Sequence, residues 1–286
     1  MGERLVRSVR RDEHQNLGRR DERKDLGRLP EPRPVAAAET GFRRLARLRR
    51  APALHPRGLT CTADLEIVAD GSEPWGVSWL DSPGRYAARV RLSRAAGLPR
   101  RLPDGLGLAV RVADADGPGR TLDLLMTSCG RGRITRHVPL PRTDVLGGPY
   151  SSLLPYRVGG RRGVLAAFPR RSRPAPVYGD PARLREALAS GPLVLDLCAE
   201  TAGTSETAGA SGVAGASRVS GASGRSWRPF GVLTVRTPLP LEEDESPGYD
   251  VYAHSLDGFS PVSALARTRR AAYRGSRAGR GTNWQD

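Results

Sequence analysis

Short segments that are apolar, or that alternate apolar with polar residues, recur through most of the chain. Each is bounded by Gly, Pro or Asp, which is typical of β-strands joined by turns. The segments are 64–68 (DLEIV), 86–93 (YAARVRLS), 105–113 (GLGLAVRVA), 121–128 (TLDLLMTS), 163–168 (GVLAAF), 193–198 (LVLDLC) and 231–237 (GVLTVRT). They do not alternate regularly with helices, as the strands of a parallel sheet do. We therefore predict an α+β fold consisting of an antiparallel β-barrel with appended helices.

Two segments have helical patterns. In 179–191 (GDPARLREALASG), Asp180 is placed to cap the N-terminus, Pro181 suits the first turn, and Gly191 suits the end. Its leucines are four residues apart and share one face. A second helix is predicted in 261–277, a segment rich in Ala and Arg.

Composition divides the chain into a core and low-complexity parts. Residues 1–36 are charged and have few large apolar side chains, so we expect a disordered basic arm. Residues 201–226 consist mainly of Gly, Ala, Ser and Thr and are expected to form a flexible insertion. A single barrel domain over 37–280 and a tail over 281–286 complete the predicted organisation.

The chain is strongly basic, with a formal net charge of +16. This charge could indicate binding to nucleic acid or to another anionic surface. However, Lys24 is the single lysine, and the arginines are spread along the chain without a nucleic-acid-binding motif. Nucleic-acid binding is therefore an alternative here and not the main prediction.

The cysteines and the termini indicate the compartment. Cys61, Cys129 and Cys198 are far apart and odd in number, so neither a disulfide framework nor a zinc site is expected. The N-terminus, MGERLVRSVRRDEHQ, lacks the apolar region of a secretory signal, and no apolar run is long enough to span a membrane. We expect a soluble cytoplasmic protein.

Polar residues in the strand 86–93 are the first candidates for chemistry. The alternation places Ala88, Val90 and Leu92 on one face and Arg91 and Ser93 on the other. On a face that points into a barrel, the arginine could hold a carboxylate and the serine could assist a proton transfer. The alternative is a half-exposed strand whose polar face lies in water.

Three further residues are candidates at the two ends of the chain. His55 lies in a turn signal, His-Pro-Arg-Gly, directly before a strand, where it is either a loop residue or a catalytic base. Arg269 and Tyr273 are four residues apart and share a face if the segment is helical. The guanidinium would then lower the pKa of the phenol, and a tyrosinate is one of the few protein groups that ligate ferric haem. The alternative is a basic tail whose tyrosine packs on the core.

Taken in order, these pieces resemble the catalases. The similarity spans about 43–280 without the insertion and resembles most the small catalase-related haem proteins that lack the C-terminal helical domain. The matching segments are HPRGLTCTADLEI (55–67), VRLSRAAG (90–97), LPDGLGLAVRV (102–112), LDLL (122–125), DPARLREALASG (180–191) and RTRRAAY (267–273).

The resemblance implies a haem site in a barrel, with haem b as the ferric cofactor. Tyr273 would be the metal ligand, Arg269 would be coupled to its charge, and Arg91 would hold a haem propionate. His55 would be the distal catalytic base, supported by Ser93.

The function implied is a haem-dependent oxidoreductase that processes peroxides, either as a weak catalase or peroxidase or as an enzyme that converts organic peroxides. Its partners would be a peroxide and a small-molecule reductant, and a homo-oligomer is compatible with the sequence. Thr127 or Ser128 stands where the family has a distal asparagine, which favours slow peroxidase chemistry over rapid dismutation. The alternatives are a binding protein of the same fold without haem and an arginine-rich binder of anionic surfaces.

Overall fold

The computed structural model describes residues 57–99, 101–171, 173–202, 225–240 and 248–262. His55, Arg269 and Tyr273, which were predicted from sequence to be site residues, lie outside these ranges.

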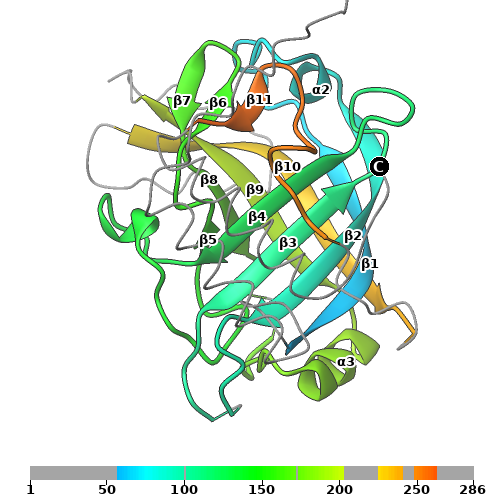
Figure 1. The fold of residues 1–286 in the computed structure, drawn as a ribbon, viewed down its shortest axis with the longest axis vertical. Helices are drawn as coiled ribbons and strands as arrows, with labels where there is room; N and C mark the ends of the chain where they lie inside the picture. Colours follow the sequence, from blue (N-terminus) through cyan, green and yellow to red (C-terminus); the bar gives the residue numbers. More distant parts are fainter. Residues whose placement is uncertain (1–56, 100, 172, 203–224, 241–247, 263–286) are drawn as a thin grey trace, which may run out of the picture. The chain divides into compact units, whose positions relative to one another are not determined.

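An eight-stranded antiparallel β-barrel forms the centre of the described part of the chain (Figure 1). Its strands pair in the closed order β1-β10-β9-β8-β5-β4-β3-β2. Their bounds are β1 (Arg57–Ile67), β2 (Gly84–Arg94), β3 (Leu106–Val112), β4 (Leu122–Ser128), β5 (Tyr150–Ser151), β8 (Leu165–Pro169), β9 (Leu193–Ala202) and β10 (Arg225–Pro238). The predicted antiparallel barrel is confirmed, and every strand expected from the hydrophobic pattern is present.

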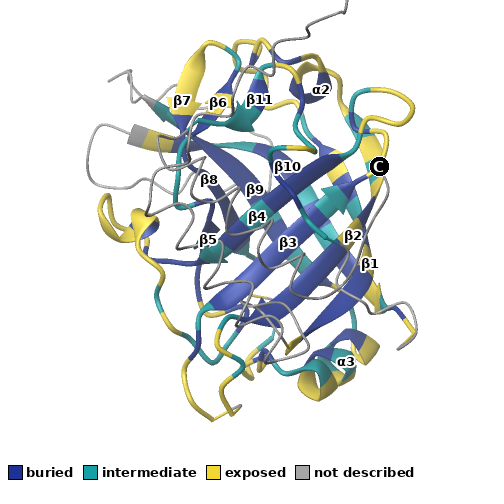
Figure 2. Ribbon diagram, in the orientation of Figure 1, coloured by how far each residue is buried: buried dark blue, intermediate teal, exposed yellow. Residues whose placement is uncertain are grey.

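Apolar side chains on one face of the barrel strands fill the barrel interior. In β1 the buried core residues include Leu59, Leu65 and Ile67, and the paired strand β2 contributes Val90 and Leu92. Figure 2 shows burial extending along the barrel strands. Since successive side chains in a strand point to opposite faces, the residues between these core positions lie on the outside of the barrel.

A smaller sheet and a cluster of aromatic residues accompany the barrel. β6 (Tyr156–Val158), β7 (Arg161–Gly163) and β11 (Phe259–Pro261) form a three-stranded sheet in the order β11-β6-β7. A single-turn helix, α2 (Ser78–Asp81), contributes Trp79, whose ring meets the ring of Phe259 at 5.3 Å between centroids. The three-residue 3-10 helix η1 (Thr135–His137) follows β4. These elements are too short to show a period in the sequence.

The helix predicted around residue 180 is confirmed as α3 (Pro181–Ala189). The Asp180 carboxylate accepts a hydrogen bond from the Arg183 backbone N–H at 3.2 Å, and a proline occupies the first turn. Leu184 and Leu188 form its buried face. The helix predicted over 261–277 lies almost wholly outside the described residues, and its first residue, Pro261, belongs to β11.

The predicted insertion lies between two paired strands. β9 continues to Ala202 and β10 starts at Arg225, and these two residues are opposite each other in the ladder. The first two and last two residues of the range 201–226 are therefore strand residues, and 203–224 lies outside the described part.

Candidate functional site

Arg91 and Ser93 lie on the outer face of the barrel, although the sequence suggested an inward-facing pair. The expectation was wrong because the apolar residues of β2, such as Leu92, occupy the interior. The second alternative, a polar face in water, is also wrong at this position. Arg91 and Ser93 are each only 7% exposed. The outer face of β1 and β2 is therefore a buried polar region.

Arg91 is held by the strand beside it. Its Nη1 donates to the Thr60 hydroxyl at 3.2 Å, and Thr60 is directly opposite Arg91 in the β1–β2 ladder. Thr60 is itself only 1% exposed. A guanidinium fixed in a buried position is suited to bind a carboxylate, because burial strengthens the attraction between opposite charges.

Gly58 allows the two strands to bring these side chains together. A methyl group at this position would lie 2.7 Å from the Leu92 carbonyl oxygen and 2.8 Å from the Ser93 Cβ. It would also lie 3.1 Å from the Cζ of Arg91. Only glycine fits without displacing the neighbouring strand. In sequence, this is the glycine of His-Pro-Arg-Gly, three residues after His55.

A row of small residues crosses the outer face at the level of Ser93. Gly58 pairs with Ser93, Ser93 with Gly107, and Gly107 with Thr127. The Ser93 hydroxyl lies 3.5 Å from the Gly107 carbonyl oxygen. The strand residues in this row are therefore small, and Ser93 and Thr127 contribute its polar side-chain atoms.

The same register distinguishes the two residues that could replace the distal asparagine. Thr127 lies on the outer face, in the row of Ser93. Ser128 follows it and points to the other face, where its hydroxyl donates to the Leu140 carbonyl at 2.7 Å and accepts from the Leu106 N–H at 2.9 Å. Thr127 is therefore the residue that shares a surface with Ser93.

The chemistry of this face, small residues beside a buried guanidinium, is compatible with a flat ligand that carries carboxylates. The row without bulky side chains can lie against a flat ring system, and Arg91 provides a buried positive charge beside it. Of the predicted cofactor-binding residues, Arg91 lies in the described part of the chain. No group of three or more His, Cys, Asp or Glu residues in the described ranges could hold a metal ion.

An ion cluster that the sequence analysis missed lies next along the outer face. Arg111 on β3 and Asp123 on β4 are paired in register and form two hydrogen bonds of 2.7 Å. Asp123 is completely buried. It also lies 2.8 Å from Nδ1 of His254 and accepts the backbone N–H of Asp250 at 2.8 Å. The signal available in the sequence was one charged residue of opposite sign in each of two successive predicted strands, Arg111 in 105–113 and Asp123 in 121–128.

The ion cluster fixes the segment 248–254 to the barrel. Arg111 donates to the Gly248 carbonyl at 3.3 Å, and its Cζ lies 5.1 Å from the centre of the Tyr249 ring. Burial raises the pKa of the Tyr249 phenol, and the Asp123 charge adds to this, while the Arg111, Arg91 and Arg89 charges oppose it. Tyr249 therefore remains protonated and can donate a hydrogen bond.

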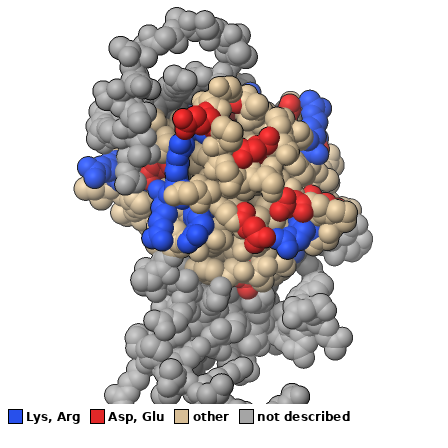
Figure 3. Space-filling view, turned by 90° about the horizontal axis from the view of Figure 1, so that it is seen from above, with Lys and Arg blue, Asp and Glu red and all other residues tan. Residues whose placement is uncertain are grey.

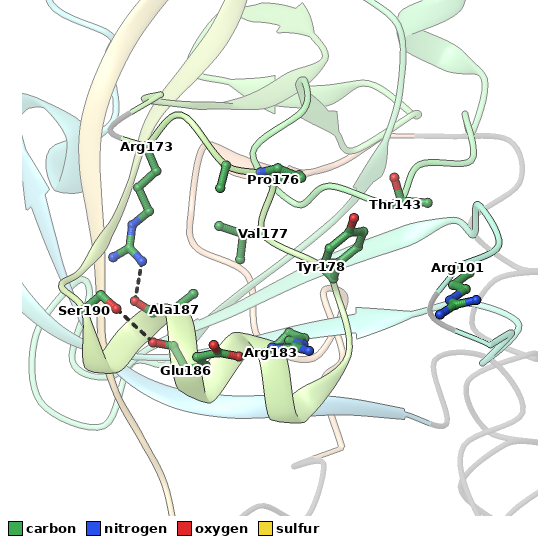
Figure 4. A pocket seen from close by; sticks show the side chains of 11 residues that line it. Arg101, Thr143, Arg173, Pro176, Val177, Tyr178, Arg183, Glu186, Ala187 and Ser190 are labelled. Carbon is green, nitrogen blue, oxygen red and sulfur yellow. Dashed lines mark hydrogen bonds and ion pairs between the residues drawn. The ribbon is translucent and has the colours of Figure 1, made fainter.

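A pocket of about 640 Å³ lies at α3, and neither Arg91 nor Ser93 lines it (Figure 4). Arg173 crosses one wall and donates to the carbonyls of Ala187 and Gly191 at 2.5 and 2.7 Å. Arg183 is paired with Glu186 at 2.5 Å. Since Arg173 satisfies the last turn of α3 and Arg183 is neutralised, these arginines have structural roles.

Charges on the surface seen in Figure 3 are mixed, with basic and acidic side chains interspersed among the described residues. Several are paired across strands, as Arg236 is with Asp64 at 2.6 Å and Arg170 with Asp196 at 2.6 Å. In the described part of the chain, no helix is both long and apolar enough to cross a membrane.

Two solved structures with a similar fold are catalases. A bacterial catalase superimposes with a TM-score of 0.54 at 12% identity, covering 93% of this chain and 63% of its own. A fungal catalase superimposes with a TM-score of 0.52 at 14% identity, covering 83% of this chain and 61% of its own. The chain thus spans a little under two thirds of each. No protein-family model matches the sequence, and no curated protein matches it. These similarities establish the fold.

Proposed function

We propose that this chain, which has the catalase fold, is a haem-dependent oxidoreductase that processes peroxides. The observation that carries the proposal is the buried Arg91–Thr60 pair beside the small-residue row of Gly58, Ser93 and Gly107. This arrangement lies on the outer face of a barrel whose fold is similar to that of a bacterial catalase. It supports a site for a flat cofactor with carboxylates, and the alternative of a haem-free binding protein is one outcome of the test below.

Arg91 would hold a propionate of haem b, and Tyr273 would provide the phenolate ligand to ferric iron. Ligation requires the phenol to lose its proton, although a tyrosine ordinarily titrates at about 10. Arg269, one helical turn before Tyr273, would favour the phenolate by its positive charge. Bound haem would supply the redox chemistry that cleaves the O–O bond of a peroxide.

His55 would move the proton in this reaction. It would accept a proton from one peroxide oxygen and donate it to the other, as a general base and then a general acid. Ser93 would orient its ring. In sequence, His55 lies two residues before Arg57, the first residue of β1, and the paired strand carries Ser93 opposite Gly58.

Thr127 would adjust the reaction. A threonine hydroxyl is shorter than the amide of an asparagine and has one donor instead of two. A peroxide would be held less firmly at this surface than in enzymes with the amide. The activity we propose is therefore slow peroxidase chemistry or conversion of an organic peroxide, with a small-molecule reductant, and not rapid dismutation.

An absorbance spectrum of full-length protein produced with added haem tests the proposal. The parent should show the intense near-ultraviolet band of bound haem, and Tyr273→Phe should lose stable haem or change its ligation spectrum. His55→Ala should keep the parental band but lose about 10²- to 10⁴-fold in peroxide turnover, the contribution of a positioned acid–base group. Tyr178→Phe, on the pocket at α3, is the matched control and should behave as the parent.

A parent that takes up no haem would overturn the proposed function and leave the haem-free binding protein. A Tyr273→Phe variant with an unchanged ferric spectrum would overturn the assigned ligand.

A further inference from the structure

The pocket at α3 has a size and a lining that suit a small ligand. Its volume of about 640 Å³ falls within the range of about 300–1,000 Å³ that is typical of small-molecule sites. One wall is α3, which contributes Arg183, Glu186 and Ala187, and the facing wall is the segment 173–178 (Figure 4). The pocket has no part in the proposed haem chemistry, so a ligand bound here would serve a separate purpose.

Hydrogen bonds fix the segment 173–178 to the rest of the fold. The Asp144 carboxylate accepts the backbone N–H of Val177 at 3.0 Å, and the Val145 N–H donates to the Val177 carbonyl at 2.8 Å. At the start of the segment, Arg173 donates to two carbonyls at the last turn of α3. Both walls are therefore held in place, and a ligand would enter a preformed site at a low cost in ordering.

The lining carries an excess of positive charge. It includes three arginines and one glutamate, and the ion pair of 2.5 Å between Arg183 and Glu186 cancels one charge of each sign. Arg173 donates to carbonyl groups, which leave its charge without a counter-ion. Within the described ranges, no carboxylate pairs with Arg173 or with Arg101. Two guanidinium charges of the lining are therefore available to an anion.

A buried arginine holds the loop that carries Arg101. Arg94 is 1% exposed, and its Nη2 donates to the carbonyls of Pro99 and Leu102 at 3.2 and 2.6 Å. Asp104 balances the charge of Arg94, with its Oδ2 3.6 Å from Nε. The two carbonyls lie on either side of Arg101 in the chain, so the backbone at Arg101 has a defined position although its side chain is exposed.

The two guanidinium groups without a counter-ion lie at opposite ends of the pocket. Figure 4 shows Arg173 at one end and Arg101 at the other, with Val177 and Tyr178 between them. Val177 offers apolar surface, and Tyr178 offers an aromatic side chain that is 38% exposed. The centre of the pocket therefore suits a hydrocarbon group, and its two ends suit anionic groups.

We infer that this pocket binds a small organic dicarboxylate. One carboxylate lies at Arg173, the other lies at Arg101, and the hydrocarbon part lies along Val177 and Tyr178. A guanidinium binds a carboxylate through charge-assisted hydrogen bonds. Arg173 has N–H groups beyond those used in its two hydrogen bonds to α3. This site is separate from the proposed haem site and does not depend on haem binding.

Calorimetric titration of the full-length protein with adipate tests the inference, with hexanoate as the monocarboxylate of the same chain length. Adipate should bind about tenfold more tightly than hexanoate, because hexanoate leaves one guanidinium without a carboxylate. Arg101→Gln should weaken adipate binding about tenfold and narrow its difference from hexanoate. Arg162→Gln is the matched control, since Arg162 is an exposed arginine of β7 and does not line the pocket. The control should leave both affinities unchanged, and both variants should unfold at the parental temperature.

Glu186→Gln gives a result that partial unfolding could not imitate. It removes the negative charge of the lining and frees Arg183, so the affinity for adipate should rise. An unchanged or lower affinity in this variant would overturn the inference. Hexanoate or inorganic phosphate bound as tightly as adipate would show that the site does not recognise two carboxylates. Equal losses in Arg101→Gln and Arg162→Gln, or no adipate binding by the parent, would also overturn it.

Discussion

At the scale of single residues, the candidate site depends on the absence of a side chain at Gly58. Gly58→Ala should destabilise the fold by about 1–3 kcal/mol, the usual cost of forcing extra atoms into a packed region. The new methyl would collide with Leu92 and Ser93 and displace Arg91, so haem uptake should fall as well. Urea unfolding and haem titration measure the two effects.

Gly84→Ala is the matched control, since a methyl group there meets no atom nearer than 3.5 Å. Gly84 opens the strand that pairs with β1, so the two variants change the same pair of strands. Equal stability of the two variants would contradict the role given to Gly58.

At the scale of secondary-structure elements, Asp123 links β3, β4 and the segment 248–254. Asp123→Ala should lower the free energy of unfolding by about 3–5 kcal/mol, because it leaves the partly buried Arg111 without its counter-charge. Glu186→Ala removes the carboxylate of a pair in which Arg183 and Glu186 are both well exposed, so it should lower the free energy of unfolding much less than Asp123→Ala does. Chemical denaturation of both variants checks the difference, and a small effect of Asp123→Ala would mean that the segment is held by other contacts.

Hydrophobic alternation predicted the barrel strands because one face of each strand fills a closed interior. The same rule failed for Arg91 and Ser93, because it assumes that the polar face of a strand lies in water or in a cavity. Here Thr60, Arg91 and Ser93 lie outside the barrel and are nevertheless buried. A sequence pattern of period two records which residues share a face, but it does not record what lies against that face. β5, with two residues, is too short to produce any pattern.

At the scale of the whole molecule, closure of the barrel is independent of the insertion between β9 and β10. Ala202 and Arg225 are already opposite each other, so their ends need no long connection. Replacing 203–224 with an Asn-Gly turn should preserve the fold, since such a turn joins paired antiparallel strands. The midpoint of thermal unfolding of the shortened protein should lie within a few degrees of the parent value, because shortening a loop changes its closure entropy only slightly.

A shortened chain that fails to fold would contradict this independence. Circular dichroism of the full-length and shortened proteins distinguishes the outcomes. An unchanged haem spectrum in the shortened protein would further separate the insertion from the cofactor site.

The pairing of β1 with β10 also sets the order of events during synthesis. The hydrogen bond from Thr62 to Thr237 joins residues 175 positions apart, so the first strand of the barrel cannot pair on this edge until the last barrel strand has been made. Contacts of such long range are slow to form. Until β10 leaves the ribosome, β1 presents an unpaired edge that can recruit other chains. A nascent or truncated chain ending before β10 is therefore the form of this protein most in need of a chaperone.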